Sequence, residues 1–122
     1  MNEGQHPGPD RSEEQIACVK RYEVMAGSGQ TGFFDVEEFE LIIDHYLCNN
    51  EARKAQLVLD QAKAQHPESV DLTFCEALVH MAMGRLNKGL EILDGLEKVE
   101  PFNEEIHLHK ASIYSQQRNY RR

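Results

Sequence analysis

The sequence predicts an all-α protein made of stacked helical hairpins, and three observations support this class. Two prolines, Pro67 and Pro101, are separated by the length of one helical hairpin repeat, about 34 residues. The same spacing of small residues and leucines precedes each proline, as Ala55, Leu59, Ala62 and as Gly89, Leu93, Leu96. No segment alternates apolar and polar residues with the period of two that marks a strand. A repeat of this length cannot close a core of its own, so neighbouring units must pack against each other.

The N-terminal part of the chain predicts a polar lead followed by one helix that caps the array. Residues 1–12 are polar and rich in glycine and proline, which predicts a disordered lead or a remnant of cloning. A helix is predicted from Glu13, with an apolar stripe formed by Cys18, Tyr22 and Met25. Three glycines in residues 27–32 then favour a loop, so residues 13–35 comprise a capping helix and its loop. The stripe also fits the second helix of a degenerate earlier repeat.

The first hairpin begins with a capping motif. Asp35 can accept a hydrogen bond from the backbone three residues on, and Glu38 can reach back to the backbone of Asp35. The helix that follows ends at Asn49-Asn50, and one face of it carries Phe39, Ile42, Ile43 and Tyr46. A second helix is predicted over residues 51–65, and its packing face consists of Ala55, Leu59 and Ala62.

The remaining helices are bounded by similar signals. Ser69 is placed to cap a third helix over residues 70–83, and Gly84 is placed to end it as a C-terminal glycine. A fourth helix is predicted over residues 86–99. Asn103 can cap a fifth helix, whose first turn carries two glutamates that complement the helix dipole.

This pattern resembles the tetratricopeptide repeat, a helix-turn-helix unit of about 34 residues, and the chain looks similar to bacterial scaffolds of that family. The repeats are residues 36–69, residues 70–103, and the first helix of a partial third repeat at 104–122. The match in the first repeat is carried by Phe39, Ile42, Ile43, Tyr46, Ala55, Leu59, Ala62 and Pro67. The second repeat departs from the pattern at Thr73, Glu76, His80 and Gly89. The resemblance implies a right-handed superhelix that serves as a protein–protein interaction scaffold.

The resemblance further implies a concave groove that is lined by the first helix of each repeat and binds a peptide or a partner helix. The main candidates that it selects are Glu37, Glu40, Asp44, Leu47, Asp71, Phe74, Leu78, Met81, Leu108 and Ser112. The same positions also include Cys48, Ala82, Glu105, Ser115 and Gln116. Members that grip a C-terminal carboxylate use basic residues and asparagine here, whereas this chain has acids. We therefore expect a ligand with Lys or Arg beside apolar residues. The alternative interpretation is an acidic helix face that is merely solvated.

Several weaker signals do not predict chemistry. Residues 27–32 spell the glycine spacing of a dinucleotide site, but a helix is predicted before them instead of a strand. His45 and Cys48 have ligand-like spacing, and no third zinc ligand is evident. Cys75 and His80 are too far apart on one helix to act together in catalysis. The sequence therefore predicts no enzyme, no cofactor and no metal site, and His80 is expected to be a half-buried packing residue.

The composition narrows the classes of partner. A net charge of −8 disfavours nucleic acid and anionic membrane surfaces and leaves basic partners open. No apolar run approaches the roughly 20 residues that span a bilayer. Three cysteines cannot all pair with one another, which favours reduced thiols in the cytoplasm.

A second function class remains open, in which the repeats stack end to end as an assembly module. The third repeat stops before its second helix, so the chain is either cut from a longer array or closed by a polar half repeat. In the first case, an exposed seam around Ile113 and Tyr114 is expected to favour self-association.

Overall fold

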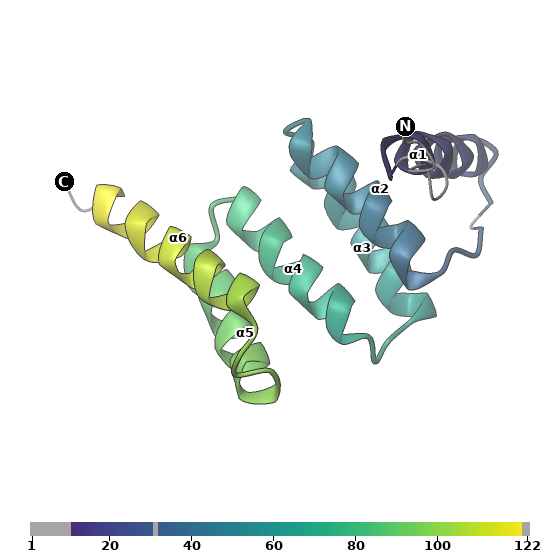
Figure 1. Cartoon of the computed structure of the whole chain (residues 1–122). Coiled ribbons are helices and arrows are strands. Elements are labelled where there is room, and N and C mark those ends of the chain that lie inside the picture. The colour runs from purple at the N-terminus through teal and green to yellow at the C-terminus, as the bar shows by residue number, and fades with distance from the viewer. Residues whose placement is uncertain (1–10, 31, 121–122) are drawn as a thin grey trace, which may run out of the picture.

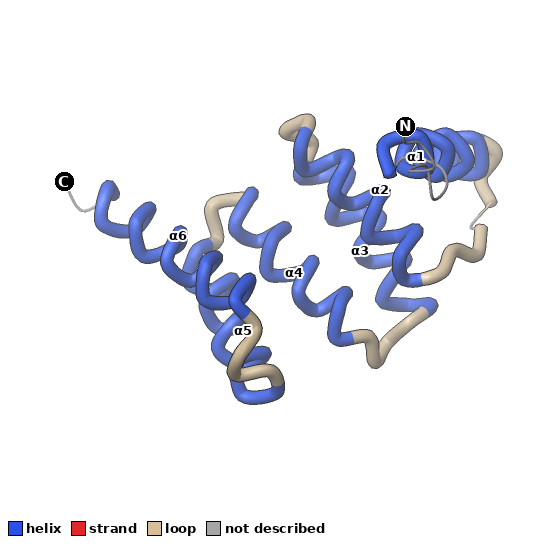
Figure 2. The backbone as a smooth tube through the Cα atoms, in the orientation of Figure 1, coloured by secondary structure: helices blue, strands red, loops and turns tan. Residues whose placement is uncertain are grey.

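The computed structural model describes residues 11–30 and 32–120, and all regular secondary structure among them is helical (Figure 2). The helices within these residues are α1 (Arg11–Gly27), α2 (Val36–Cys48), α3 (Ala52–Gln65), α4 (Val70–Ala82), α5 (Leu86–Val99) and α6 (Glu104–Tyr120). The predicted all-α class is confirmed. Helix α1 begins two residues earlier than expected, so Arg11 and Ser12 are helical and do not belong to a lead. The rest of that predicted lead, residues 1–10, lies outside the described residues.

The backbone repeats itself with the same period as the two prolines. Helices α2, α4 and α6 begin at residues 36, 70 and 104, and helices α3 and α5 begin at residues 52 and 86. The turns inside the two hairpins also correspond, because Asn50 and Gly84 both have a left-handed backbone, with φ of 60° and 79°. Each turn is closed by one 2.8 Å backbone hydrogen bond, which Glu51 donates to Tyr46 and Arg85 donates to His80. The two hairpins are therefore built from the same local geometry.

The helices form two rows (Figure 1). Helices α2, α4 and α6 lie side by side in one row, and α3 and α5 lie behind them. Each helix packs on the next one along the chain, and α2 also packs on α4. Helix α1 covers α2 at one end of the array and α6 closes the other end. The first helices of the hairpins thus share one face of the molecule.

The predicted helix caps are all present. The Asp35 side chain accepts a 2.8 Å hydrogen bond from the Glu38 backbone, and the Asp35 backbone donates a 3.0 Å hydrogen bond to the Glu38 side chain. The Ser69 hydroxyl accepts from the Leu72 backbone at 3.2 Å. The Asn103 side chain accepts from the backbone of Glu105 at 2.9 Å. These bonds satisfy backbone N–H groups that have no partner within their own helix.

The core divides into two clusters that meet at α4. The first joins α1 to α4 and includes the expected face of α2, whose four residues are all buried. The second joins α4 to α6 and contains Leu93 and Leu96. Ala55 and Ala62 are fully buried, and a Cβ added at Gly89 would lie only 3.3 Å from the Ala77 carbonyl oxygen. The departure at Gly89 therefore reflects a closer approach of α5 to α4, which leaves little room for a side chain.

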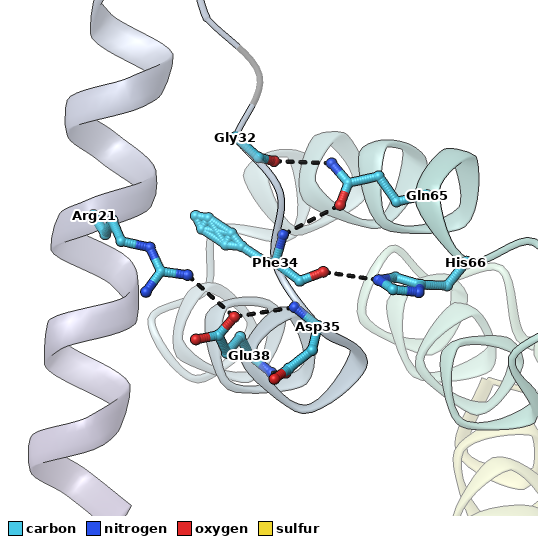
Figure 3. A network of polar contacts seen from close by, with 7 residues as sticks. All are labelled: Arg21, Gly32, Phe34, Asp35, Glu38, Gln65 and His66. Atoms are coloured by element: carbon cyan, nitrogen blue, oxygen red, sulfur yellow. Dashed lines mark hydrogen bonds and ion pairs between the residues drawn. The ribbon is translucent and has the colours of Figure 1, made fainter.

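Phe34 is a core residue that the sequence pattern does not predict, because it lies in the segment that joins α1 to α2. It is 1% exposed and packs against Phe39 and Tyr22 at ring-centre distances of 5.4 and 6.1 Å. The guanidinium of Arg21 lies 4.3 Å from the centre of the Phe34 ring and 3.1 Å from Glu38 (Figure 3). Helix α1 is thereby joined to the start of α2.

The C-terminal end of α3 holds the same segment through polar contacts (Figure 3). The Gln65 amide donates to the Gly32 carbonyl at 2.9 Å and accepts from the Phe34 backbone at 3.2 Å. His66 Nε2 lies 2.7 Å from the Phe34 carbonyl oxygen. A Cβ added at Gly32 would overlap the thioether of Met25, so the segment passes close to α1 at this point. These contacts give the extended backbone hydrogen-bond partners while the Phe34 ring is buried.

Helix α6 packs on α5 through Ile106 and Ile113, and Ile113 is one of the two residues for which the sequence predicts an exposed seam. Ile106 and Ile113 are buried in the second cluster, whereas Tyr114 is 49% exposed. The expectation that Ile113 belongs to an exposed seam is wrong, because the face of α6 that carries it packs against α5. The uncovered face includes Tyr114 and the 68% exposed Leu108.

Ion pairs join consecutive hairpins at corresponding positions with opposite polarity. Lys63 of α3 lies 2.7 Å from Glu76 of α4, and one repeat later Glu97 of α5 lies 2.7 Å from Lys110 of α6. Asp94 also contacts Lys110 at 2.7 Å, and Asp94 and Glu97 together raise the pKa of Lys110 above its usual value. The departure from the repeat pattern at Glu76 therefore has a structural role.

We predict that Lys63→Glu lowers the free energy of unfolding by about 1 kcal/mol, because it places a second carboxylate beside Glu76. The double variant Lys63→Glu/Glu76→Lys should recover most of this loss, since Glu97 and Lys110 adopt that polarity in the next hairpin. Chemical denaturation of both single variants, the double variant and the parent chain measures the coupling. Purely additive losses would contradict the prediction.

We also predict that Gly84→Val destabilises the chain by about 1–2 kcal/mol, because a β-branched residue is strained in the left-handed region. Gly84→Asn should cost much less, since Asn50 has the same conformation in the first hairpin. Thermal unfolding monitored by circular dichroism compares the two. Equal losses would show that the backbone conformation at this turn is not the cause.

Candidate functional site

Five of the predicted groove residues line one hollow between α2 and α4. They are Glu40, Asp44, Leu47, Phe74 and Leu78. The hollow has a volume of about 260 Å³. Ile43 and Cys75 also line it, and α1 and α6 contribute Arg11 and Glu105. Side chains that are far apart in the sequence thus converge where the first helices of the hairpins lie side by side.

The helical period explains which residues face the hollow. On α2 the lining residues follow at intervals of three, one and three, from Glu40 to Leu47. On α4 the same face carries Phe74 and Leu78, which are four residues apart. The more buried sides of both helices meet α3 and α5. The groove face is consequently the side of α2 and α4 that their second helices leave uncovered.

The electrostatics of the hollow are dominated by carboxylates. The pKa of Glu40 is raised, first because the group is partly buried, and then because Asp71, Glu37 and Glu105 add negative charge; Arg11 opposes this rise. The second residues of α2, α4 and α6 are Glu37, Asp71 and Glu105, so each hairpin adds one acid at the same end. The N-terminal end of the site therefore carries acids from three helices, and Asp44 adds a further carboxylate along α2. Phe74 and Leu78 of α4 form the apolar part of the lining.

Cys75 contributes packing to this site. Burial raises the pKa of its thiol to about 12, and the nearby carboxylates of Glu40, Asp71 and Asp44 add to the rise. A thiol with this pKa is protonated near neutral pH and is a poor nucleophile. The hollow therefore offers acidic hydrogen-bond acceptors and apolar contact, without an activated nucleophile among the described groups.

The other predicted groove residues are placed differently. Glu37 and Asp71 are exposed beside the acidic end of the hollow. Met81 packs with the second core cluster, with its Cγ 3.1 Å from the position of a Cβ on Gly89. Leu108 is exposed on α6, and the Ser112 hydroxyl accepts a 3.3 Å hydrogen bond from Gln116. The hollow therefore gathers the α2 and α4 candidates more closely than those of α6.

Helix α1 takes part in the site, which the sequence reasoning missed. Its first residue, Arg11, lines the hollow, and the Gln15 side chain donates to the Leu41 carbonyl at 2.9 Å and to Asp44 at 3.4 Å. Through this bond, Gln15 of α1 helps to hold the carboxylate of Asp44 in place. Arg11 and Gln15 lie outside the predicted groove positions, so only the packing of α1 on α2 shows this contribution.

Two further hollows have different linings. The larger, of about 590 Å³, lies between the turns of the two hairpins and is lined by long basic side chains that include Arg53, Lys54 and Arg85. The other, of about 340 Å³, lies between α1 and α3 and includes Tyr22, Tyr46 and Leu57. Flexible side chains such as Arg53 and Lys54 can fill the first hollow themselves. The acidic hollow between α2 and α4 differs from both in combining an excess of carboxylates with the apolar side chains of Leu47, Phe74 and Leu78.

His80 is a half-buried packing residue, as expected. Its Nδ1 is buried without a hydrogen-bond partner, and its Nε2 lies 3.9 Å from Glu76. Its pKa is lowered, because burial outweighs the opposing effect of Glu76, and the charges of Arg85, Lys88 and Lys63 add to the lowering. A neutral imidazole therefore occupies the position that Tyr46 fills in the first hairpin.

The two candidate metal ligands His45 and Cys48 each contact a different neighbouring side chain. The Asn49 side chain lies 3.3 Å from the His45 ring, and the Cys48 thiol lies 3.9 Å from Asp44. Among residues 11–30 and 32–120, no group of three His, Cys, Asp or Glu side chains has an arrangement suited to a metal ion. The glycine-rich segment after α1 includes Thr31, which lies outside the described residues, and no strand is assigned in the described chain before it.

Comparison of this chain with protein-family models, with curated proteins and with solved structures gave no match. Within the part of the chain that the structure describes, none of the helices has the length and apolar character needed to cross a membrane.

The burial of His80 predicts a pH dependence of stability. Because its pKa is lowered from the usual value of 6.5, the unfolded chain takes up a proton more readily than the folded one. The contribution of His80 should destabilise the fold progressively as the pH falls through and below 6.5. His80→Tyr should reduce this loss, because tyrosine takes up no proton in this range and is the residue at the corresponding position of the first hairpin. Thermal unfolding at neutral and mildly acidic pH provides the measurement.

Proposed function

We propose that this chain is a protein–protein interaction module of the tetratricopeptide type, in which the hairpins form a right-handed superhelix. The support is the constant offset that relates the bounds of α2, α4 and α6 and those of α3 and α5. The small residues at the close contacts, Ala55 and Gly89, also occupy corresponding positions. Both features are typical of helical repeats whose function is to present a continuous surface.

We propose that the acidic hollow binds a segment of a partner protein in which Lys or Arg stands beside apolar residues. The observation that carries this proposal is the convergence of Glu40, Asp44 and Glu105 around an apolar floor. A basic side chain gains charge-assisted hydrogen bonds from the carboxylates, while a neighbouring apolar side chain loses contact with water against Phe74 and Leu78. The lining therefore complements both the basic and the apolar side chain of the ligand.

We propose a non-enzymatic role in the cytoplasm. The raised pKa of the Cys75 thiol, which keeps it protonated and a poor nucleophile, supports binding rather than catalysis. Cys18, Cys48 and Cys75 are all free thiols, which fits a reducing compartment. The net charge of −8 favours a protein or peptide partner over nucleic acid or an anionic membrane surface.

An assembly role remains the second candidate, and one observation favours it. Leu108 and Tyr114 are large apolar side chains that are exposed on the uncovered face of α6. Apolar groups at the end of a helical array can pack against a further helix or a neighbouring molecule. In this alternative the acidic hollow stays empty and the ends of the array make the contact.

The groove proposal predicts the effect of reversing its charge. Binding of blocked peptides that combine Lys or Arg with Leu or Phe should be at least about tenfold weaker for the variant Glu37→Lys/Glu40→Lys/Asp44→Lys. A variant with the same change in net charge, Glu13→Lys/Glu68→Lys/Glu91→Lys, should bind nearly as well as the parent. Fluorescence anisotropy measures the affinities, and circular dichroism checks that each variant is folded.

Equal affinity of both triple variants would show that only the net charge of the protein matters. Absence of binding by every peptide of this kind would remove the groove proposal. In that case, a loss of self-association in Leu108→Ser/Tyr114→Ser would favour the assembly role.

A further inference from the structure

A basic segment of the chain carries the chemistry that the acidic hollow is proposed to bind. Residues 118–122 read Arg-Asn-Tyr-Arg-Arg, so three arginines surround one tyrosine. Arg118 is exposed near the C-terminal end of α6. The chain as a whole has a net charge of −8, so a segment with three arginines and no acid differs in charge from the rest. An arginine can form two hydrogen bonds to one carboxylate, and tyrosine has an aromatic body suited to an apolar floor.

The hollow already has one arginine on its wall. Arg11 lines it together with Glu40 and Glu105, and the charge of Arg11 opposes the rise in the pKa of Glu40. Five acids nevertheless line or adjoin the hollow: Glu37, Glu40, Asp44, Asp71 and Glu105. One arginine leaves most of this negative charge available for a further basic group.

The basic segment lies far from the acidic end of the hollow in its own molecule. Glu105 and Arg118 lie at opposite ends of α6 and are separated by about 20 Å along a helix that rises about 1.5 Å per residue. The N-terminal ends of α2, α4 and α6 point toward the same edge of the molecule (Figure 1). Glu40, Asp71 and Glu105 all lie in the N-terminal halves of these helices. Residues 121–122 add at most about 7 Å of chain. This separation favours an occupant from another molecule at the acidic end of the hollow.

We propose that residues 118–122 of one copy of this chain bind in the acidic hollow of a second copy. This inference rests on the proposed function, because it assigns an occupant to the same groove. The arginines pair with the acids that line or adjoin the hollow, which are Glu37, Glu40, Asp44, Asp71 and Glu105. The tyrosine packs on Phe74 and Leu78. Each copy has one groove and one basic segment, so the contact is head to tail and extends into chains unless it closes into a ring.

Sedimentation velocity of the full chain provides the first test. The average mass should rise with protein concentration, and the association should weaken at least about tenfold between roughly 0.05 and 0.5 M NaCl, because the contact is mainly between charges. Association should be lost in the groove variant Glu37→Lys/Glu40→Lys/Asp44→Lys and in the segment variant Arg118→Glu/Arg121→Glu/Arg122→Glu. The control Lys20→Glu/Arg53→Glu/Lys98→Glu lowers the net charge by the same amount as the segment variant. It should retain most of the association.

Mixing the two variants gives the sharpest outcome. The segment variant keeps an intact acidic groove and the groove variant keeps an intact basic segment, so an equimolar mixture should associate although neither protein does so alone. A parent chain that is monomeric at every concentration would overturn the inference. Association that persists in both variants would also overturn it and would indicate contact through Leu108 and Tyr114.

A peptide experiment separates this inference from the proposed function. A blocked peptide of residues 115–122 should bind the segment variant and should not bind the groove variant. A peptide with the same composition in scrambled order should bind several-fold more weakly. If the 115–122 peptide fails while other basic and apolar peptides bind the groove, the inference is wrong and the proposed function stands. If no such peptide binds the groove, both are wrong.

Discussion

The architecture depends on the close packing of the second helix of each hairpin against the first helices on either side of it. Ala55 and Ala62 on α3 are fully buried, and Gly89 on α5 approaches the Ala77 carbonyl so closely that a Cβ there would be crowded. Small residues let the helix backbones come together, and Leu59 and Leu93 then fill the remaining space. Larger side chains at these contacts would separate the two rows of helices, and the hairpins would no longer stack in register.

The acidic hollow follows from this stacking. Because α3 and α5 lie behind the other row, α2, α4 and α6 turn the same side toward solvent (Figure 1). The first turns of these helices carry acids that stabilise each helix separately through its dipole. Stacking partly buries Glu40 and brings the other acids near it, and burial followed by these charges raises the pKa of Glu40. The resulting local negative charge favours a basic ligand. A feature that helps each helix to form thus also determines the chemistry of the face they share.

How far the fold could be predicted depends on the range of the interactions. The capping box of Asp35 and Glu38 and the cap at Ser69 involve neighbours within three residues, so a single sequence predicts them. The burial of Phe34 depends on α1 and on the end of α3, and no helical period marks a residue in a connecting segment. The predicted groove residues also divide into those that spacing on one helix places correctly and those whose place depends on a neighbouring helix. Spacing on one helix groups Glu40 with Asp44, but the empty position at Gly89 draws Met81 into the core.

The sequence by itself determined the all-helical class, the helix boundaries to within one or two residues, the period of the repeat and the charges of the first turns. Each of these depends on local backbone preferences or on a regular spacing. Only the tertiary structure decided which faces became walls of a hollow and which became core. Arg11 and Gln15 joined the site from a helix outside the repeat, and Ile113 was buried because α5 covers that face of α6. These outcomes depend on contacts between residues far apart in the chain, which helical periodicity alone does not specify.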